Sequence, residues 1–302
     1  MRIATAYAQQ LAVEGIAERQ AKLLEAQEQL SSGKRVSTPS DDPAAAAQAE
    51  RLRSREARIA AEQRAATHAR QMLSSADTAL GDATDLLQSA REALLAASNA
   101  TTTPQDRALY GEQLRQLRGQ LLAVANRGDG TGGYVFGGQG TLTPPVAESG
   151  TQYLAPAGTQ VVGQEQQNPV SLDGRENFTA IRTPSGTESI FERLDTAIAA
   201  LTDPATTQVQ AAAAAGTAIG SVDRAIDRFG VTRTVVGERL RALDAHEQAL
   251  ASGSIENQSR LSDLVDVDFA RGASNMIQQQ TSLEAALKSY AQVARMTLFD
   301  YV

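Results

Sequence analysis

Cysteine and tryptophan are absent from this 302-residue chain, and aromatic residues make up only 4% of it. Without cysteine there are no disulfides, no thiolate catalysis and no thiolate metal ligands. With so few aromatic residues, a large core would have to be built from Ala, Leu, Val and Ile, which favours thin helical packing over a thick globule. The length suffices for about two domains at the usual ~100–200 residues each.

Clustered positive charge and long apolar runs are also missing. The net charge is −7 and the isoelectric point is near 5.0, whereas nucleic-acid binding depends on clustered Lys and Arg. No apolar run reaches ~18 residues, and the N-terminal residues lack the apolar core of a cleavable signal peptide. We therefore expect no nucleic-acid partner, no membrane association and no export by the general secretory route.

Residues that could carry catalysis or hold a metal are sparse. His68 and His246 are the only histidines, and neither has a second histidine three or four residues away, so they form no zinc site or triad. The run GDGTGG at 128–133 matches a phosphate-binding glycine pattern, but no capped helix follows it. The aspartates that could be imagined as carboxylate pairs or calcium ligands are better explained as helix caps or lack the remaining ligands: Asp41, Asp42, Asp263, Asp266 and Asp268. We predict no enzyme activity, no cofactor and no metal site.

What the sequence does contain is a sustained seven-residue repeat. Its apolar positions are Leu52, Ile59, Ala66, Leu73, Leu80, Leu87 and Leu94, and alanine follows three residues after most of them. This repeat predicts one long supercoiling helix over residues 44–98, roughly 80 Å in length. Arginines and glutamates alternate along its first part, which predicts a solvated face; the arginines are Arg51, Arg53, Arg55, Arg58, Arg64 and Arg70.

Further helices are predicted on both sides of a central segment of different character. The segment TTTPQD at 101–106 ends the first long helix, and Thr103 or Asp106 can cap the next one. Residues 128–185 are rich in glycine, proline and β-branched residues, which predicts short strands, with Asp173-Gly174 as a hairpin turn. Helical periodicity returns after residue 190, stops at TDPATT and continues in a second long seam, which we expect to pack antiparallel to the first.

The two ends of the chain carry mirrored breaks. In LSSGKRVSTPSDDP at 30–43, Gly33 can end a helix and Asp42 followed by Pro43 can start one. A second register break falls at LSDLVDVD near the C-terminus, so we expect the two ends to pair. Because the end segments have few apolar anchors, we predict that they are weakly folded alone and become helical on assembly. Apolar residues along a seam that has no partner within the chain indicate association with another molecule. The alternative is a coiled coil that is complete within one chain.

The predicted fold is mainly α: a long antiparallel helical coiled-coil bundle with paired N- and C-terminal helices and a small β-rich insertion. The expected domains are an N-terminal helix and spoke (residues 1–44) that pairs with residues 259–302, a helical bundle (45–127 and 186–258) and the insertion (128–185).

The break LSSGKRVSTPSDDPAAAA resembles the one after the first helix of the bacterial flagellin superfamily, and SRLSDLVDVDFARGASNM resembles the matching C-terminal half. Three further features resemble the hook-filament junction proteins of that superfamily more than flagellins: GGYVFGG at 132–138, the helix QQQTSLEAALKSYA and the ending LFDYV. The resemblance covers roughly residues 1–145 and 185–302, and the insertion is much shorter than in many relatives.

The resemblance implies a structural role. Such proteins are exported unfolded by flagellar type III export with a chaperone, and then form an extracellular, ring-like layer of copies between a hook-associated protein and flagellin. Subunit contacts would involve Ile16, Leu23, Leu30, Met276, Leu283, Leu287 and Leu298. The spoke that connects the inner helices to the outer bundle would depend on Gly33, Asp41, Asp42 and Pro43.

Two alternatives remain open from the sequence. A filament-forming flagellin would share both terminal signatures and would grow long polymers when seeded. A cytoplasmic coiled-coil adaptor would have terminal helices that are stable in the monomer, and it would stay inside cells.

Overall fold

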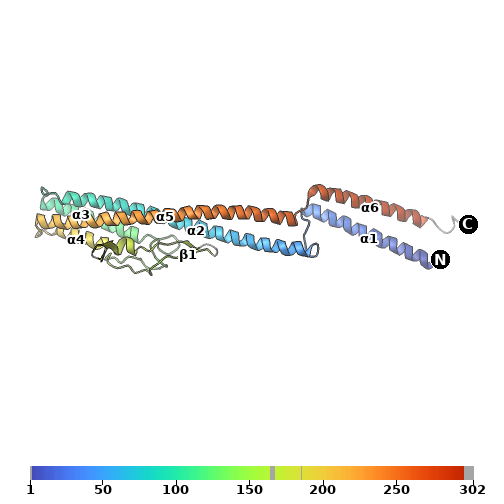
Figure 1. The fold of residues 1–302 in the computed structure, drawn as a ribbon, viewed down its shortest axis with the longest axis horizontal. Coiled ribbons are helices and arrows are strands. Elements are labelled where there is room, and N and C mark those ends of the chain that lie inside the picture. The colour runs from blue at the N-terminus through green and yellow to red at the C-terminus, as the bar shows by residue number, and fades with distance from the viewer. Residues whose placement is uncertain (1, 164–166, 185, 296–302) are drawn as a thin grey trace. The chain divides into compact units, whose positions relative to one another are not determined.

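The computed structural model describes residues 2–163, 167–184 and 186–295 (Figure 1). Its long elements are six α-helices: α1 (Arg2–Ser32), α2 (Pro43–Ala97), α3 (Pro104–Ala125), α4 (Ile190–Thr202), α5 (Gln208–Val265) and α6 (Phe269–Arg295). The long helix expected at 44–98 and the breaks at TTTPQD, TDPATT and LSDLVDVD all fall where the sequence predicts them. The mainly helical fold is confirmed.

Side-chain caps explain where several helices begin. Before α3, Thr103 and Asp106 form a reciprocal capping box, and Pro104 occupies the first helical position, where a missing N–H costs nothing. Before α4, the hydroxyl of Ser189 accepts a hydrogen bond from the Phe191 amide at 3.2 Å. Polar residues at these points satisfy amides that have no partner within the helix.

The insertion between α3 and α4 contains little regular structure. Strand β1 (Val161–Val162) pairs antiparallel with β2 (Asn168–Pro169), and β3 (Ile181–Thr183) pairs antiparallel with β4 (Gly186–Glu188). A single turn of π-helix, η1 (Arg175–Thr179), precedes β3. The hairpin turn predicted at Asp173-Gly174 is wrong, because Gly174 has right-handed helical dihedrals and begins η1, while Asp173 bridges to Gly137.

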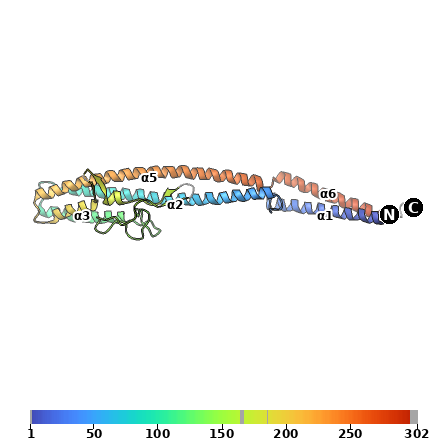
Figure 2. The same ribbon diagram turned by 60° about the horizontal axis from the view of Figure 1, so that its bottom comes forward.

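The two long helices α2 and α5 lie side by side and antiparallel (Figure 2). Within residues 60–251, the Arg70 guanidinium contacts Glu247 at 2.8 Å and Arg91 contacts Asp223 at 2.7 Å. As the residue number on α2 rises, that of the partner on α5 falls, which defines an antiparallel pair. Between them, the apolar positions of the seven-residue repeat are buried from Ile59 to Leu94.

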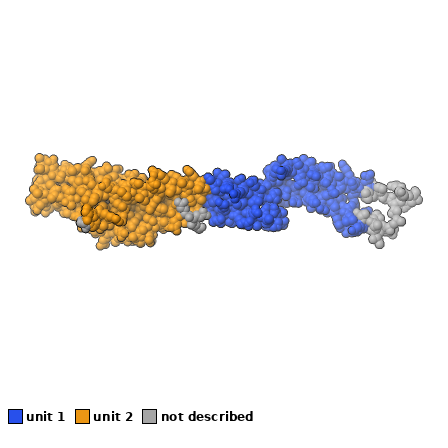
Figure 3. Space-filling view, in the orientation of Figure 1, with its two compact units in different colours: residues 1–59, 252–302 blue, residues 60–251 orange. Residues whose placement is uncertain are grey.

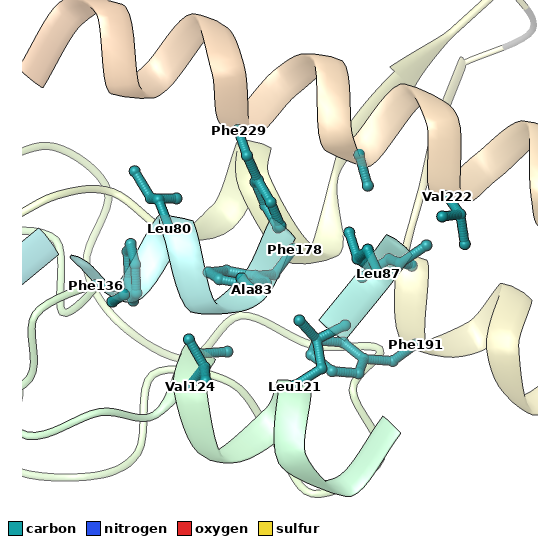
Figure 4. Packing of buried hydrophobic residues seen from close by; sticks show 14 of the residues in the cluster. Leu80, Ala83, Leu87, Leu121, Val124, Phe136, Phe178, Phe191, Val222 and Phe229 are labelled. Carbon is teal, nitrogen blue, oxygen red and sulfur yellow. The ribbon is translucent and has the colours of Figure 1, made fainter. Parts of the chain in front are cut away.

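An aromatic cluster closes the core where the insertion meets the helices (Figure 4). The ring of Phe178, in η1, lies 5.1 Å from that of Phe136, 5.2 Å from that of Phe229 and 6.3 Å from that of Phe191, measured between centroids. All four side chains are fully buried. The cluster contains four of the six phenylalanines in the chain.

Polar contacts attach the insertion to the bundle. The Arg118 guanidinium pairs with Asp195 at 3.0 Å, donates to the carbonyls of Glu148 and Ser149, and lies 5.4 Å from the centroid of the Phe191 ring. The Tyr153 hydroxyl donates to the Phe136 carbonyl at 2.6 Å, and burial raises the pKa of Tyr153 to about 12. These bonds fix loops that have almost no strand pairing of their own.

Glu188, at the end of β4, is a buried carboxylate held by two arginines. Its side chain is 7% exposed and accepts from Arg193 at 2.8 Å and Arg224 at 2.6 Å. Burial alone would raise the pKa of Glu188, but hydrogen bonds from Arg224 and Arg193 outweigh it and leave the pKa lowered. Because the folded pKa is depressed, this carboxylate stabilises the fold above its unfolded pKa, and the contribution is lost as the pH falls through the folded pKa.

Replacing Glu188 with glutamine should therefore lower the free energy of unfolding at pH 7 by about 1–3 kcal/mol, because both arginines lose their charged partner. The loss is no larger because both arginines are more than a third exposed, so solvent screens the two ion pairs. Urea unfolding followed by circular dichroism at a series of pH values measures the effect. The difference in stability between the wild type and Glu188→Gln should be full above the ordinary glutamate pKa of about 4.3, and it should narrow as the pH falls from there through the lowered folded pKa of Glu188. A gap that stays constant down to pH 3 would contradict this account.

The chain divides into two compact units, residues 1–59 with 252–302, and residues 60–251 (Figure 3). The boundary between residues 59 and 60 falls inside α2, and the boundary between residues 251 and 252 falls inside α5. The domains expected from the sequence instead end where helices end or where the composition changes at the insertion. The domain boundaries given by the sequence stay a prediction. We call residues 1–59 with 252–302 the terminal unit.

Candidate assembly site

Helix α1 ends at a glycine in the terminal unit. The hydroxyls of Ser31 and Ser32 donate to carbonyls of the last helical turn, at 3.0 and 3.4 Å. Gly33 follows with φ +71°, a left-handed conformation that side chains with a Cβ disfavour. The backbone therefore leaves the helix sharply at the position where the sequence predicts the break.

The two mirrored breaks pair with each other. Lys34 and Asp266 form an antiparallel bridge, with the Arg35 amide donating to the Val265 carbonyl at 2.7 Å and the Val267 amide donating to the Gly33 carbonyl at 2.9 Å. The Arg35 guanidinium also reaches the Leu264 carbonyl at 2.6 Å. Backbone hydrogen bonds thus join the end of α1 to the end of α5. The sequence shows only that the two breaks mirror each other and does not predict these bonds.

Two aspartates organise the loop that leads to α2. We call residues 33–43 the spoke. Asp41 accepts hydrogen bonds from the amides of Thr38, at 2.7 Å, and Ser37, at 2.9 Å. Asp42 accepts from the Ala45 amide at 3.0 Å and Pro43 opens the helix, as the cap interpretation predicts. These bonds, led by those from Thr38 and Ala45, lower the pKa values of Asp41 and Asp42.

Helices α1 and α6 form an antiparallel pair within the terminal unit (Figure 1). Near the middle of the pair, the Arg19 guanidinium donates to the Ser282 hydroxyl at 2.9 Å. Near one end of the pair, Leu30 lies so close to Gly272 that a Cβ on this glycine would be 2.9 Å from the Leu30 Cδ2 atom. Glycine at 272 therefore permits the close approach of the two helices.

The residues predicted to contact neighbouring subunits differ in how exposed their side chains are. Five of them are half-buried, in helices that pack on each other: Ile16, Leu23, Leu30, Met276 and Leu283. The Leu287 side chain is 47% exposed. Leu298 lies outside the described residues. The half-buried positions recur every seven residues along α1 and α6, so they are placed to hold this pair together inside one chain.

Other apolar side chains on the same two helices are exposed, and of these the periodicity of the sequence picks out only Val13 and Phe269. The exposed residues are Tyr7, Leu11, Val13, Leu24, Phe269 and Ile277, each at least half exposed. Phe269 continues the seven-residue spacing of Met276 and Leu283, whereas Tyr7, Leu11, Leu24 and Ile277 lie outside the regular spacing. An apolar residue directly after a seam position is the signal that could have identified Leu24 and Ile277.

The remaining candidate residues have structural roles. In GDGTGG, Asp129 accepts from the amides of Thr131, at 2.7 Å, and Gly133, at 2.9 Å, so the loop is bonded to its own aspartate. Asp268 accepts from the amides at the start of α6, and Asp266 accepts from the Ser262 hydroxyl. His68 and His246 are half-buried on α2 and α5.

Two searches of the described residues bear on ligands and membranes. In residues 2–163, 167–184 and 186–295, no three His, Cys, Asp or Glu side chains gather as metal ligands. In the same part of the chain, no helix combines the length and apolar character needed to cross a bilayer.

Comparisons with known proteins point to the flagellum. Residues 3–141 match the bacterial flagellin N-terminal helical region. The chain is 33% identical to flagellar hook-associated protein 3 of Escherichia coli, over 99% of both chains. Its fold is similar to that of a flagellar hook-associated protein from Vibrio parahaemolyticus, at 22% identity and a TM-score of 0.66, covering 75% of this chain and 100% of that one. It is also similar to the flagellar junction protein FlgL from Legionella pneumophila, at 19% identity and a TM-score of 0.57, covering 66% and 99%.

Proposed function

We propose that this chain, which belongs to the flagellar hook-associated protein 3 family of structural flagellar proteins, forms the junction layer between a hook-associated protein and the flagellin filament. The layer consists of copies of the chain that contact one another through the terminal helices. The proposal rests on the 33% sequence identity to a hook-associated protein over 99% of both chains, together with the pairing of the terminal helices α1 and α6.

The surface of the terminal helices supports assembly. Single exposed apolar residues are normal on a protein surface, whereas several on one helix pair indicate a contact. Tyr7, Leu11 and Val13 lie within two turns of α1, and Phe269 and Ile277 lie on α6. Covering each of these side chains on assembly is worth up to about 1.5–3 kcal/mol.

The predicted interface residues then fall into two groups with different roles. Ile16, Leu23 and Leu283 are half-buried and hold α1 against α6, so they shape the assembly surface without needing to touch a neighbour. Leu287, with the exposed apolar residues that flank the seam, contacts the next subunit. The spoke sets the direction in which the helix pair leaves the bundle, through Gly33 and the capping carboxylates of Asp41 and Asp42.

The proposal includes a route and a set of partners. The chain leaves the cell unfolded through flagellar type III export, accompanied by a chaperone, and becomes ordered when it meets the growing structure. A terminal pair with only partly buried apolar residues suits such late ordering, because ordering backbone costs ~1–2 kcal/mol per residue before packing offsets it. The partners are other copies of the chain, a hook-associated protein on one side and flagellin on the other.

Deleting the gene tests the function. We expect the deletion strain to make hooks, to lack filaments and to release flagellin into the medium, because the filament has no junction on which to grow. Electron microscopy of the cells and immunoblots of the medium measure both results, and the wild-type gene on a plasmid serves as the control. If the chain were the filament subunit itself, the medium of the deletion strain would contain no other filament protein, and the proposal would fail.

A further inference from the structure

The parts of α2 and α5 that belong to the terminal unit bury mostly small or polar side chains. On α2, the buried residues before the division at residue 59 are Ala45, Ala49 and Ile59. On α5, the buried residues after the division at residue 252 are Asn257 and Val265. Helices pack by fitting ridges of side chains into grooves, and alanine makes only a shallow ridge. Apolar packing alone therefore does little here to set how far α5 is displaced along α2.

Asn257 is a buried polar residue that contacts one turn of α2. Its side chain is 2% exposed, and its Nδ2 atom donates to the Leu52 carbonyl at 2.9 Å and to the Glu56 carboxylate at 2.8 Å. Both partners are acceptors, so only the nitrogen side of the amide can face them. The Asn257 Oδ1 atom is also buried, and it has no hydrogen-bond partner among the described residues. An unpaired buried acceptor costs stability, so this contact is not arranged for the greatest stability.

The carboxylate of Glu56 is bound by uncharged side chains of α5. Besides the Asn257 amide, it accepts hydrogen bonds from the Ser254 hydroxyl at 2.6 Å and the Gln258 amide at 3.2 Å. These bonds, led by the one from Ser254, lower the pKa of Glu56, so the carboxylate is ionised at neutral pH. In the part of the chain that the structure describes, no Lys or Arg side chain lies within salt-bridge distance of it. Serine and asparagine side chains are too short to follow the carboxylate if one helix is displaced along the other.

A displacement of α5 by about one turn would break all of these hydrogen bonds. Four residues correspond to about 6 Å along a helix axis, roughly twice the length of a hydrogen bond. The buried amide and the carboxylate would then lose their partners, and leaving such groups unpaired costs more than a formed hydrogen bond contributes. Coiled coils accommodate offsets of three or four residues by local unwinding or overwinding. Packing within residues 60–251 therefore does not by itself determine the alignment of α2 and α5 in the terminal unit.

We infer that Asn257 and Glu56 determine the alignment of α5 on α2 in the terminal unit by penalising every other alignment. A single buried asparagine sets the register of coiled coils in the same way, at a cost in stability. The alignment matters for the spoke, because Asp266 directly follows α5 and forms the antiparallel bridge to Lys34. A displacement of about 6 Å would separate these two residues. Asn257 is thus a positioning residue for the bridge that joins the two mirrored breaks.

Disulfide formation between introduced cysteines measures the alignment in the purified full-length chain, which has no cysteine of its own. A Cβ on Gly253 would lie 3.9 Å from the Ile59 Cδ1 atom, so Ile59→Cys/Gly253→Cys reports the observed alignment. Arg55→Cys/Gly253→Cys reports an α5 displaced by four residues. With Asn257 present, the first pair should form a disulfide within one chain and the second should not. Asn257→Leu keeps the branched shape without the amide, and it should accelerate disulfide formation by the second pair at least roughly tenfold.

Three further variants separate alignment from ordinary stabilisation. Glu56→Gln keeps an acceptor oxygen for the Asn257 amide and should preserve the observed alignment, whereas Glu56→Leu should permit the displaced one. Ser259→Leu, at an exposed position of α5, is the matched control and should leave the disulfide pattern unchanged. The urea midpoint of Asn257→Leu should stay the same or rise, because the variant removes an unpaired acceptor and buries more apolar surface.

A displaced pair that stays unreactive in both leucine variants would overturn the inference. So would a loss of helix content in Asn257→Leu, measured by circular dichroism, because Asn257 would then be required for folding and not for alignment. All of these measurements use the isolated chain and need no assembly. Their failure therefore leaves the proposed function untouched, and filaments in the deletion strain would refute that function without bearing on Asn257.

Discussion

Phe178→Ala destabilises residues 60–251 by about 3–5 kcal/mol, the usual cost of removing a buried phenylalanine. Phe178 is fully buried and its ring contacts those of Phe136, Phe191 and Phe229. These neighbours come from the insertion, α4 and α5, so the ring joins three parts of the unit. The alanine variant leaves a cavity that rigid helices on two sides cannot close.

The effect should be concentrated around the insertion. Strands β1 to β4 are two or three residues long and a two-stranded hairpin has little stability of its own, so the insertion depends on this cluster. Hydrogen exchange measured by mass spectrometry should show the strongest loss of protection at η1 and β3, and urea unfolding gives the free energy.

The matched control for this variant is Leu142→Ala. The Leu142 side chain also belongs to the insertion but is 87% exposed, so its removal should change stability by less than about 0.5 kcal/mol. A loss below about 1 kcal/mol for Phe178→Ala would show that the aromatic cluster does not hold the insertion in place.

Gly33→Val should strongly reduce assembly of the junction while residues 60–251 remain folded. Gly33 has φ +71°, and a β-branched residue there costs on the order of 1–2 kcal/mol or more. The cost is conformational, because the nearest atom to an added Cβ is the Phe269 Cζ at an ordinary 3.8 Å. Each 1.4 kcal/mol corresponds to about tenfold in an equilibrium constant, and every copy in the layer carries the change.

Two control variants separate backbone conformation from side-chain size. Asparagine tolerates left-handed dihedrals, so Gly33→Asn should retain most filaments. Gly15, inside α1, has no positive φ and has open space around it, so Gly15→Ala should also be tolerated. Filament counts by electron microscopy and swimming in soft agar measure all three variants. Normal filaments with Gly33→Val would exclude the spoke as a conformational requirement.

The helices could be predicted from the sequence because several local signals agree. The repeat from Leu52 to Leu94 gave a helix at 44–98, and α2 runs from Pro43 to Ala97. Its start is marked by a capping aspartate and a proline, and the start of α3 by Thr103. Where periodicity, caps and helix-breaking residues point to one answer, single-sequence prediction places the ends within a residue or two.

The insertion and the assembly surface could be predicted only in outline. Asp173-Gly174 has the composition of a hairpin turn, but the local preference is overridden by the bridge to Gly137 and the packing of Phe178 in η1. For the terminal helices, the repeat identifies Ile16 and Leu283 as seam positions without saying which helix covers them. Pairing of α1 with α6 inside the chain uses part of that seam, and exposed flanking residues such as Leu24 have no periodic signature.

Immunogold labelling of isolated flagella with an antibody against this chain tests the central claim most directly. The account predicts one narrow band of label at the distal end of the hook, where the filament begins. Label along the whole filament would identify the chain as a flagellin, and label confined to the cell interior would contradict a place in the flagellum.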